Sequence, residues 1–323
     1  MPAPANASEA IVICTRNRPT ELRPTLDSIA AHPPSASTFL AVIDASDDDA
    51  LRENREHIAE FGAVPAAHWP YPAAPSLPRQ RNYALDRLPS SVSVVHFIDD
   101  DVTVQAGYFS ALSDVLQTRP DVGGVGGVIV EPDEIRSAPR CPMLQRLFLL
   151  RHPEPGRVLP SGCTTSAQSP AAGAPAGLRD TQWLSGCSSS YRRRLLHRHR
   201  FDAALAGYAM LEDLDLSYRI GQEARLVVQP QARLRHRRAP RNRLDAERYA
   251  RALTVHRRWF VEKHLGGGAA RGAFWWSVVG RLLAVSMSSD PHRDAALRGV
   301  LQGIRTVWSH DHPLLRRGPM GAS

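Results

Sequence analysis

The chain has 323 residues, of which 43% are hydrophobic and 22% charged, with a formal net charge of +8 at pH 7. This length suffices for one large domain or two smaller ones, and the composition is ordinary for a globular protein. No uninterrupted apolar stretch reaches the roughly 18 residues that indicate a membrane span, and the first residues lack the features of a signal peptide. The four cysteines are far apart without a C-x-x-C pair, which disfavours a zinc site or a disulfide framework. A cytoplasmic, reduced protein is expected.

The positive charge is concentrated in the second half of the chain. Residues 188–260 contain 17 Arg against 7 Asp and Glu, a local excess of +10. Such a patch suits nucleic acid, an anionic membrane or a phosphate-bearing substrate, and a solvated basic face explains it equally well. The patch lacks the interleaved aromatic residues of single-strand binders, which disfavours nucleic acid as a partner.

The first ninety residues alternate between strand and helix patterns. Strands are predicted at 10–14, 38–43 and near residue 64, helices at about 22–30, 45–61 and 79–88, and a proline-rich loop at 68–78. This alternation predicts parallel βαβ units, whose ligands bind outside the carboxyl ends of the strands. Residues 15–18 and Asp44 each follow a strand, so we expect both at that edge of the sheet.

Three consecutive aspartates follow the apolar run 92–98, which is the next predicted strand. The carboxylates of Asp99, Asp100 and Asp101 repel one another in such a position. A divalent cation would relieve that repulsion because Mg²⁺ and Mn²⁺ take oxygen ligands. A solvated turn is the alternative, since Asp is common in turns and at helix N-caps.

The middle of the chain is less regular. A helical stripe at 108–116 precedes a strand at 125–130, which is predicted to follow a glycine-rich turn at 123–127. These glycines lack the order of a phosphate-binding loop, and we expect them to permit tight turning and the close approach of another backbone. Residues 152–180 are rich in Pro, Gly, Ser and Ala, which predicts a long flexible loop of the kind that serves as a lid or is disordered.

Glu212 and Asp213 open a predicted helix at about 212–220. Early carboxylates also compensate the positive end of a helix, so the residues alone leave a structural and a catalytic role open. Strand patterns at 225–229 and 232–236 follow, and the second ends in His236. A single histidine in such a place is more often a surface residue than a ligand.

The C-terminal region, residues 241–323, has helical patterns throughout. Within 273–287, one predicted apolar face comprises Trp275, Val278, Val279, Leu282 and Val285. Core packing or a dimer contact explains this face. An interfacial membrane helix explains it too, because paired tryptophans and nearby arginines are typical of such helices.

The order of these motifs resembles family 2 of the nucleotide-sugar-dependent glycosyltransferases, which have the GT-A fold. The matching segments are 11–19, 42–47, 77–82, 97–101, 183–192 and 212–219. The resemblance implies an α/β fold with a Rossmann-like, mostly parallel sheet flanked by helices, and a C-terminal helical extension. It implies a GT-A domain over 1–240, with a nucleotide-sugar-binding half (9–120) and an acceptor and catalytic half (121–240) that contains the flexible loop 152–180, followed by the helical region 241–323.

The resemblance also implies the chemistry. A sugar would move from a nucleotide-diphosphate sugar to a hydroxyl of a glycan or lipid-linked acceptor, with inversion, while Mg²⁺ or Mn²⁺ neutralises the departing diphosphate. Asp213 matches the general base, and Glu212 would orient the acceptor or the base. The implied nucleotide-sugar contacts are Thr15, Arg16, Asn17, Asp44, Arg81, Asp99 and Asp100. The implied metal ligands are Asp101, Asp99 and His236, with Asp100 left open in place of Asp101, and the implied acceptor contacts are Trp183 and Gly186.

Two other functions remain open on the sequence. A metal-dependent nucleotidyltransferase would also use paired carboxylates, but it would release pyrophosphate and give Asp213 no role as a base. A non-catalytic basic binding module on a GT-A-like fold is the second. The basic patch and Trp275-Trp276 lead us to expect peripheral contact with an anionic membrane at its cytosolic face. The sequence leaves open which sugar, which acceptor and which nucleotide base are used, and which oligomeric state the protein has.

Overall fold

The computed structural model describes residues 7–132, 142–170, 177–205, 209–238 and 244–316, which belong to two compact units. Unit 1 comprises Met1–Ser137 and Ser166–Arg241, and unit 2 comprises Ala138–Thr165 and Asn242–Ser323. This division differs from the predicted one at residues 138–165, which were expected in the acceptor half and instead pack with the C-terminal helices. Six residues of the predicted loop 152–180, residues 171–176, lie outside the described part.

Unit 1 is built on a sheet that has nine strands among the described residues, in the order β3-β2-β1-β4-β8-β6-β9-β5, with β7 paired to β9. The strands are β1 (Glu9–Thr15), β2 (Thr38–Asp44), β3 (Ala66–Pro70), β4 (Val94–Asp99), β5 (Val102–Val104), β6 (Val122–Val130), β7 (Arg179–Thr181), β8 (Ser188–Arg192) and β9 (Arg225–His236). All strands except β5, β7 and β8 run in one direction. The predicted α/β fold with a mostly parallel sheet is confirmed.

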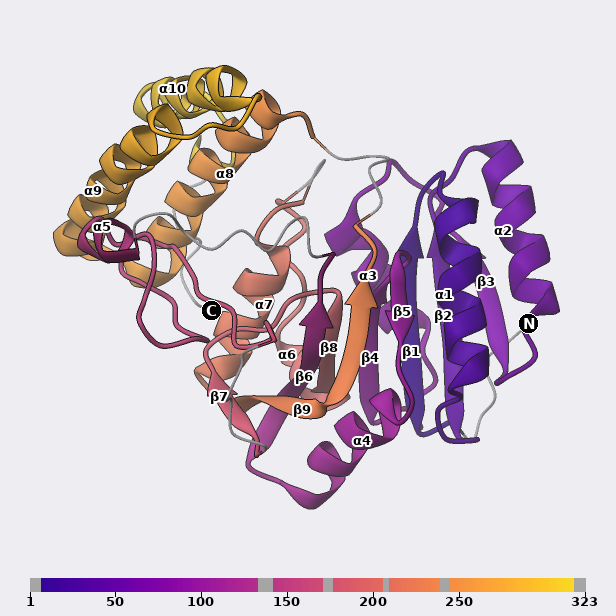
Figure 1. Ribbon diagram of the computed structural model, residues 1–323. Coiled ribbons are helices and arrows are strands. Elements are labelled where there is room, and N and C mark those ends of the chain that lie inside the picture. Colours follow the sequence, from indigo (N-terminus) through magenta and orange to yellow (C-terminus); the bar gives the residue numbers. More distant parts are fainter. Residues whose placement is uncertain (1–6, 133–141, 171–176, 206–208, 239–243, 317–323) are drawn as a thin grey trace. The chain divides into compact units, whose positions relative to one another are not determined.

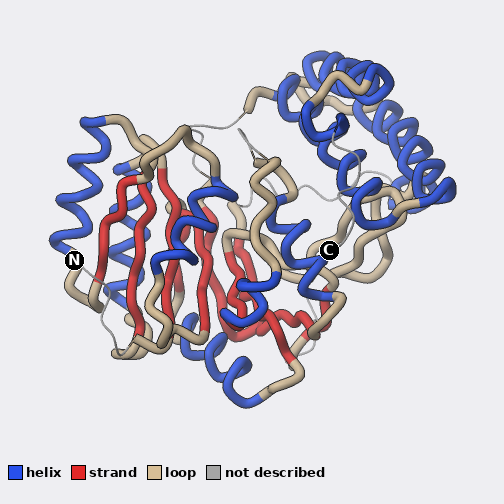
Figure 2. Tube along the Cα trace, turned by 180° about the vertical axis from the view of Figure 1, so that it is seen from behind, coloured by secondary structure: helices blue, strands red, loops and turns tan. Residues whose placement is uncertain are grey.

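Helices cover both faces of this sheet (Figures 1 and 2). The helices of unit 1 are α1 (Pro19–Ala31), α2 (Asp48–Glu60), α3 (Leu77–Arg87), α4 (Tyr108–Thr118), α6 (Arg193–Arg198) and α7 (Glu212–Gly221). Alternate residues of β1 point to opposite faces. Ile11 and Ile13 pack with apolar residues of α1, α2 and α4, whereas Ala10 and Val12 pack with those of α3, α6 and α7.

Three predicted boundaries in unit 1 are corrected by the structure. β3 includes His68, which was expected in the proline-rich loop. The glycines at 123–127 lie inside β6 rather than in a turn before it, and the two strands predicted at 225–229 and 232–236 are the single strand β9. The expected close approach of another backbone is confirmed, because a Cβ at Gly126 would lie 2.8 Å from the carbonyl oxygen of Ser188 and one at Gly127 would lie 2.7 Å from that of Ala232.

Unit 2 is helical in its described part. Its elements are α5 (Pro142–Leu147), α8 (Ala246–Phe260), the π-helical turn η2 (Val261–Leu265), α9 (Gly267–Ser286), α10 (Arg293–Ser309) and α11 (Pro313–Arg316). Phe274, Val278 and Val300 contribute to its buried core. The predicted apolar face of α9 is wrong at Val279, which is 46% exposed. It also omitted Phe274, whose side chain is fully buried in the core. Among the described residues, no helix is long and apolar enough to cross a bilayer.

Candidate active site

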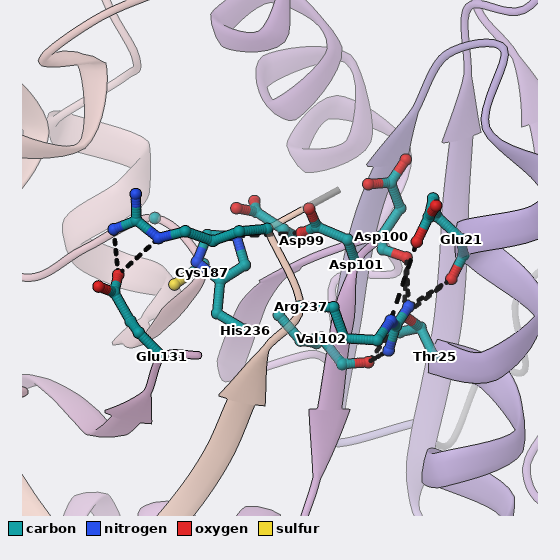
Figure 3. A network of polar contacts seen from close by, with 12 residues as sticks. Glu21, Thr25, Asp99, Asp100, Asp101, Val102, Glu131, Cys187, His236 and Arg237 are labelled. Carbon is teal, nitrogen blue, oxygen red and sulfur yellow. Dashed lines mark hydrogen bonds and ion pairs between the residues drawn. The ribbon is translucent and has the colours of Figure 1, made fainter. Parts of the chain in front are cut away.

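A carboxylate–histidine group forms where β4 ends. Asp99 is the last residue of β4, and β5 begins three residues later and pairs with β9, with Val102 opposite His236. This pairing brings Nε2 of His236 to 3.1 Å from Oδ1 of Asp101. One ligand atom from each of Asp99, Asp101 and His236 lies within 4.8 Å of the other two (Figure 3). Two carboxylates and an imidazole are a suitable ligand set for a divalent cation such as Mn²⁺.

Asp100 has a different environment from its two neighbours. Its Oδ2 accepts a hydrogen bond from the hydroxyl of Thr15, and its Oδ1 accepts one from Nη1 of Arg18, both at 2.7 Å. Arg18 also donates to Oδ2 of Asp101 at 2.7 Å. Burial raises the pKa of Asp100 to about 7. Asp100 does not belong to the group of ligand atoms formed by Asp99, Asp101 and His236.

Asp101 is more strongly ionised than Asp100. Burial acts to raise its pKa, but the hydrogen bond and charge of His236, together with the charge of Arg18, hold the pKa of Asp101 well below its ordinary range. A carboxylate that stays ionised beside an imidazole is the better cation ligand. This geometry favours Asp101 over Asp100, the alternative that the sequence left open.

The turn that carries the aspartates is held by Arg237, which the sequence reasoning overlooked. The backbone N–H of Arg237 donates to the carbonyl of Asp101 at 2.9 Å. Its guanidinium donates to the carbonyl of Glu21 at 2.6 Å and to the hydroxyl of Thr25 at 3.0 Å (Figure 3). The only signal in the sequence was its position directly after His236. Arg18 was expected at this edge of the sheet, but the sequence reasoning assigned it no role at the site.

Asp44 is a buried acceptor at the end of β2. Its Oδ2 lies 2.9 Å from both Nδ2 of Asn54 and Nε2 of His68, and its Oδ1 accepts the N–H of Ser46 at 2.9 Å. Burial acts to raise the pKa of Asp44, but these hydrogen bonds, His68 first among them, hold it below its ordinary value. Asp44 is therefore an ionised, rigidly held carboxylate. His68 and Asn54 are supporting residues that the sequence did not reveal.

The turn after β1 is clamped to the turn after β2. The side chain of Asn17 donates to Oδ2 of Asp47 at 2.7 Å and accepts the Asp47 N–H at 2.8 Å. Asn17 has φ +53°, a left-handed conformation that is uncommon outside glycine. Its side chain thus fixes the loop between Thr15, which is buried, and Arg18, whereas Arg16 is exposed.

Arg81 of α3 joins the aspartates to α7. Its guanidinium is buried and lies 3.4 Å from Oδ1 of Asp99 and 3.4 Å from Oε1 of Glu212. It also donates to the carbonyl of Gly186 at 3.2 Å. Burial raises the pKa of Glu212 to about 8, and the charge of Asp213 adds to this effect while Arg81 opposes it. Arg81 was expected to contact the nucleotide, and the structure gives it these three protein partners.

Asp213 follows Glu212 at the start of α7 and is more exposed. Its Oδ2 accepts the backbone N–H of Gly186 at 2.9 Å, and its Oδ1 accepts the N–H of Leu214 at 2.7 Å. The residue before the helix, Leu211, has φ +65°, and such strained residues cluster at functional sites. Trp183 is half-buried in the segment that leads to Gly186. The structure thus brings the predicted catalytic and metal-binding residues together through Arg81.

The fold and this acidic group define an α/β protein with a ligand site at the carboxyl ends of its strands. The sequence model of glycosyl transferase family 2 matches residues 10–198, and the chain belongs to that family. No match was found among curated protein sequences.

Solved structures with a similar fold include two glycosyltransferases. The first is GalNAc-T7 with UDP, GalNAc and Mn²⁺, with a TM-score of 0.56 and 13% identity over 85% of this chain; the chain spans 55% of that protein's length. The second is the mannosyltransferase PcManGT from Pyrobaculum calidifontis in complex with GDP-Man and Mn²⁺. Its TM-score is 0.54, with 14% identity over 97% of this chain and 89% of that one. At these identities the likeness establishes the fold.

Proposed function

We propose that the protein is an inverting glycosyltransferase that moves a sugar from a nucleotide-diphosphate sugar to a hydroxyl of a glycan or lipid-linked acceptor. The observation that carries this proposal is the group of Asp99, Asp101 and His236, linked through Arg81 to the carboxylates of α7. Family membership supports it. Both similar structures named above contain Mn²⁺ and a nucleotide or nucleotide sugar.

Asp99, Asp101 and His236 would hold Mg²⁺ or Mn²⁺, since carboxylate oxygens suit either ion and the imidazole favours a transition metal such as Mn²⁺. When bound, the ion would supply positive charge that offsets the charge of the leaving diphosphate. Asp44, ionised and rigid, would accept a hydrogen bond from the nucleotide base. Thr15, Arg16 and Asn17 belong to the adjacent turn, where the ribose and base are expected.

Asp213 would take the proton from the acceptor hydroxyl. The N–H of Gly186 fixes one of its oxygens at 2.9 Å, which orients the carboxylate before the acceptor binds. The buried pair of Glu212 and Arg81 would position this part of α7. One displacement from the face opposite the leaving diphosphate would invert the anomeric carbon without a covalent intermediate. Trp183 would offer an aromatic face to the acceptor sugar.

Unit 2 supports peripheral contact with an anionic membrane. All ten large hydrophobic side chains that are strongly exposed among the described residues belong to it. The most exposed on α5 and α9 are Met143, Leu147, Trp276, Val279, Leu283 and Met287. Arg271 lies within α9 and Arg293 is the first residue of α10, and both would favour anionic headgroups. A membrane-bound position would suit a lipid-linked acceptor.

The binding part of this proposal is tested by thermal unfolding with a panel of nucleotide-diphosphate sugars, each with and without Mn²⁺. Only a ligand that binds the folded state raises the melting temperature. We expect one donor to stabilise the protein in a Mn²⁺-dependent manner, and stabilisation by a nucleoside triphosphate but by no nucleotide sugar would contradict the proposal.

A further inference from the structure

Within the described part of unit 2, three arginines have buried guanidinium nitrogens without a hydrogen-bond partner. These atoms are Nε of Arg257, Nη1 of Arg258 and Nε of Arg281. Unpartnered buried polar atoms are rare in folded proteins, and each costs free energy, especially where the group is charged. Arg257 and Arg258 lie on α8 and Arg281 lies on α9, so the feature joins two helices of the same unit.

Arg257 contacts α9 at Ser277, one helical turn before Arg281. Nη2 of Arg257 donates to the hydroxyl of Ser277, and its Cζ lies 5.3 Å from the ring centre of Phe274. Ser277 and Arg281 are four residues apart on α9, so their side chains lie on the same face in successive turns. Arg281 therefore lies one helical turn from the contact between Arg257 and Ser277.

No carboxylate forms an ion pair with Arg257 or Arg281 within the part of the chain that the structure describes. Glu262, in η2, is already paired with both Arg258 and Arg271. Burial, and then the charge of Arg257, lower the pKa of Arg281 below its ordinary value. Two buried cations that repel each other without a counter-ion are a costly arrangement, and a bound anion would offset that cost.

The segment 156–165 lies against the same arginines. Gly162 has φ +75°, and a Cβ there would lie 3.4 Å from the carbonyl oxygen of Arg257. Cys163 and Tyr249 are the groups whose electrostatic effect favours the charged form of Arg281. Neither side chain is a carboxylate. Arg257 and Arg281 therefore have no carboxylate as a counter-ion among the residues that the structure describes.

We propose that Arg257 and Arg281 bind a phosphate group. Guanidinium groups recognise phosphate through paired, charge-assisted hydrogen bonds, and two of them match the charge of a dianion. The group would come either from a free phosphate or from the headgroup of an anionic lipid, since both present the same oxygens. The proposal does not rest on transferase activity, because these residues lie outside the family match at 10–198.

Thermal unfolding in EDTA at constant ionic strength tests the site, with inorganic phosphate as the probe and chloride as the reference salt. The wild-type protein should show a saturable rise in melting temperature, and Arg281→Gln should weaken the apparent affinity by about tenfold or more. Arg52→Gln is the matched control, because Arg52 is an exposed arginine of α2 paired with Asp49. Equal phosphate responses in all three proteins would overturn the proposal.

A second readout separates binding from a structural role. Without phosphate, Arg281→Gln should melt at or above the wild-type temperature, because the substitution removes a buried charge that is repelled by its neighbour. A structural arginine predicts a lower melting temperature with an unchanged phosphate response, and that pair of results would refute the site. Binding of UDP with Mn²⁺ to Arg281→Gln should remain at the wild-type level, which keeps this test independent of the donor site.

Vesicles distinguish the two sources of the phosphate group. Co-sedimentation with vesicles that contain phosphatidic acid, but not with phosphatidylcholine alone, should be weakened by Arg281→Gln if the ligand is a headgroup. A response to soluble phosphate alone assigns the site to a free phosphate or a soluble ester. Both results support the site, and the absence of any Arg281-dependent response to either probe rejects it.

Discussion

The backbone N–H of Gly186 donates to Oδ2 of Asp213 at 2.9 Å, while the carbonyl of the same residue accepts a hydrogen bond from Arg81 at 3.2 Å. One peptide segment thus orients the proposed base and also fixes the arginine that joins α7 to Asp99. A Cβ at position 186 would lie 2.8 Å from both terminal nitrogens of Arg81, so any side chain there requires the guanidinium group to move.

Gly186→Ala should therefore lower transferase activity while leaving the fold intact. The added methyl group displaces Arg81 and the hydrogen bond to Asp213, and a shift of about 1 Å in such a group can cost about a hundredfold in rate. Gly62→Ala is the matched control, since a Cβ at Gly62 meets nothing within 4 Å. Comparison of kcat for the two variants checks this prediction, and equal values would show that Gly186 has no positioning role.

Asp213→Asn should remove the proposed base without weakening donor binding. Loss of a general base costs about 10²–10⁴-fold in rate, and we expect this loss in kcat with an unchanged affinity for the nucleotide sugar. Asp49→Asn, at a highly exposed position of α2, serves as the control. Wild-type kcat in Asp213→Asn would eliminate the assignment of the base and would fit the nucleotidyltransferase alternative.

Asp101→Asn and His236→Gln should each weaken Mn²⁺ binding. Both residues offer a ligand atom to the group at the end of β4, and we expect losses of about tenfold or more in affinity, measured calorimetrically in the presence of UDP. Asp27→Asn, which changes an exposed aspartate of α1, should bind Mn²⁺ as the wild type does. If Asp101→Asn kept its affinity while Asp100→Asn lost it, the choice of Asp101 over Asp100 would be wrong.

The raised pKa of Glu212 predicts a specific pH dependence of stability. Burial raises this pKa from 4.5 to about 8, so the folded protein binds a proton over that window that the unfolded chain releases. The free energy of unfolding should therefore fall as the pH rises from 4.5 to about 8. Glu212→Gln should have a flatter profile over this range. Denaturant unfolding in EDTA measures both profiles, and identical slopes would contradict the prediction.

Trp276→Ser and Leu283→Ser should each reduce binding to vesicles that contain anionic lipid. Trp276 is 45% exposed and Leu283 is 47% exposed, so both changes remove apolar surface. Trp276→Ser also removes the stacking on Phe148, whereas Leu283→Ser leaves that contact in place. Co-sedimentation measures binding, and circular dichroism checks the fold. If the variants bound vesicles normally but changed from dimer to monomer in sedimentation analysis, the apolar face would be a contact between two copies of the chain.

The sequence predicted those parts of the molecule that local patterns determine. The alternation of apolar strands and helices revealed the α/β sheet, and the strand before Asp99 placed the aspartates at its carboxyl edge. The relation between Asp101 and His236 was inferred only from family resemblance, because it depends on the pairing of β5 with β9 across more than 130 residues. The roles of Arg237 and Arg18 were not predicted, because they depend on contacts with backbone carbonyls and carboxylates that a periodic sequence pattern does not indicate.

The misplaced boundaries have a similar cause. The glycines of β6 were predicted to form a turn, but they lie inside the strand. At Gly124 and Gly127, the side chains of Tyr191 and Tyr108 occupy the space that a Cβ would fill. Residues 138–165 lack regular apolar spacing, and their place in unit 2 is decided by contacts such as the stacking of Phe148 on Trp276 at 4.8 Å. These boundaries were therefore missed because they depend on packing between residues that are far apart in the sequence.

The most direct test of the proposed function is the identity of the product released from a nucleotide donor. Purified protein should be incubated with nucleotide-diphosphate sugars and nucleoside triphosphates, with Mn²⁺ or with EDTA, and the released nucleoside diphosphate and pyrophosphate should be quantified. We predict Mn²⁺-dependent release of nucleoside diphosphate from one nucleotide sugar, lost in Asp213→Asn. Pyrophosphate release from a triphosphate, without turnover of any nucleotide sugar, would contradict the account.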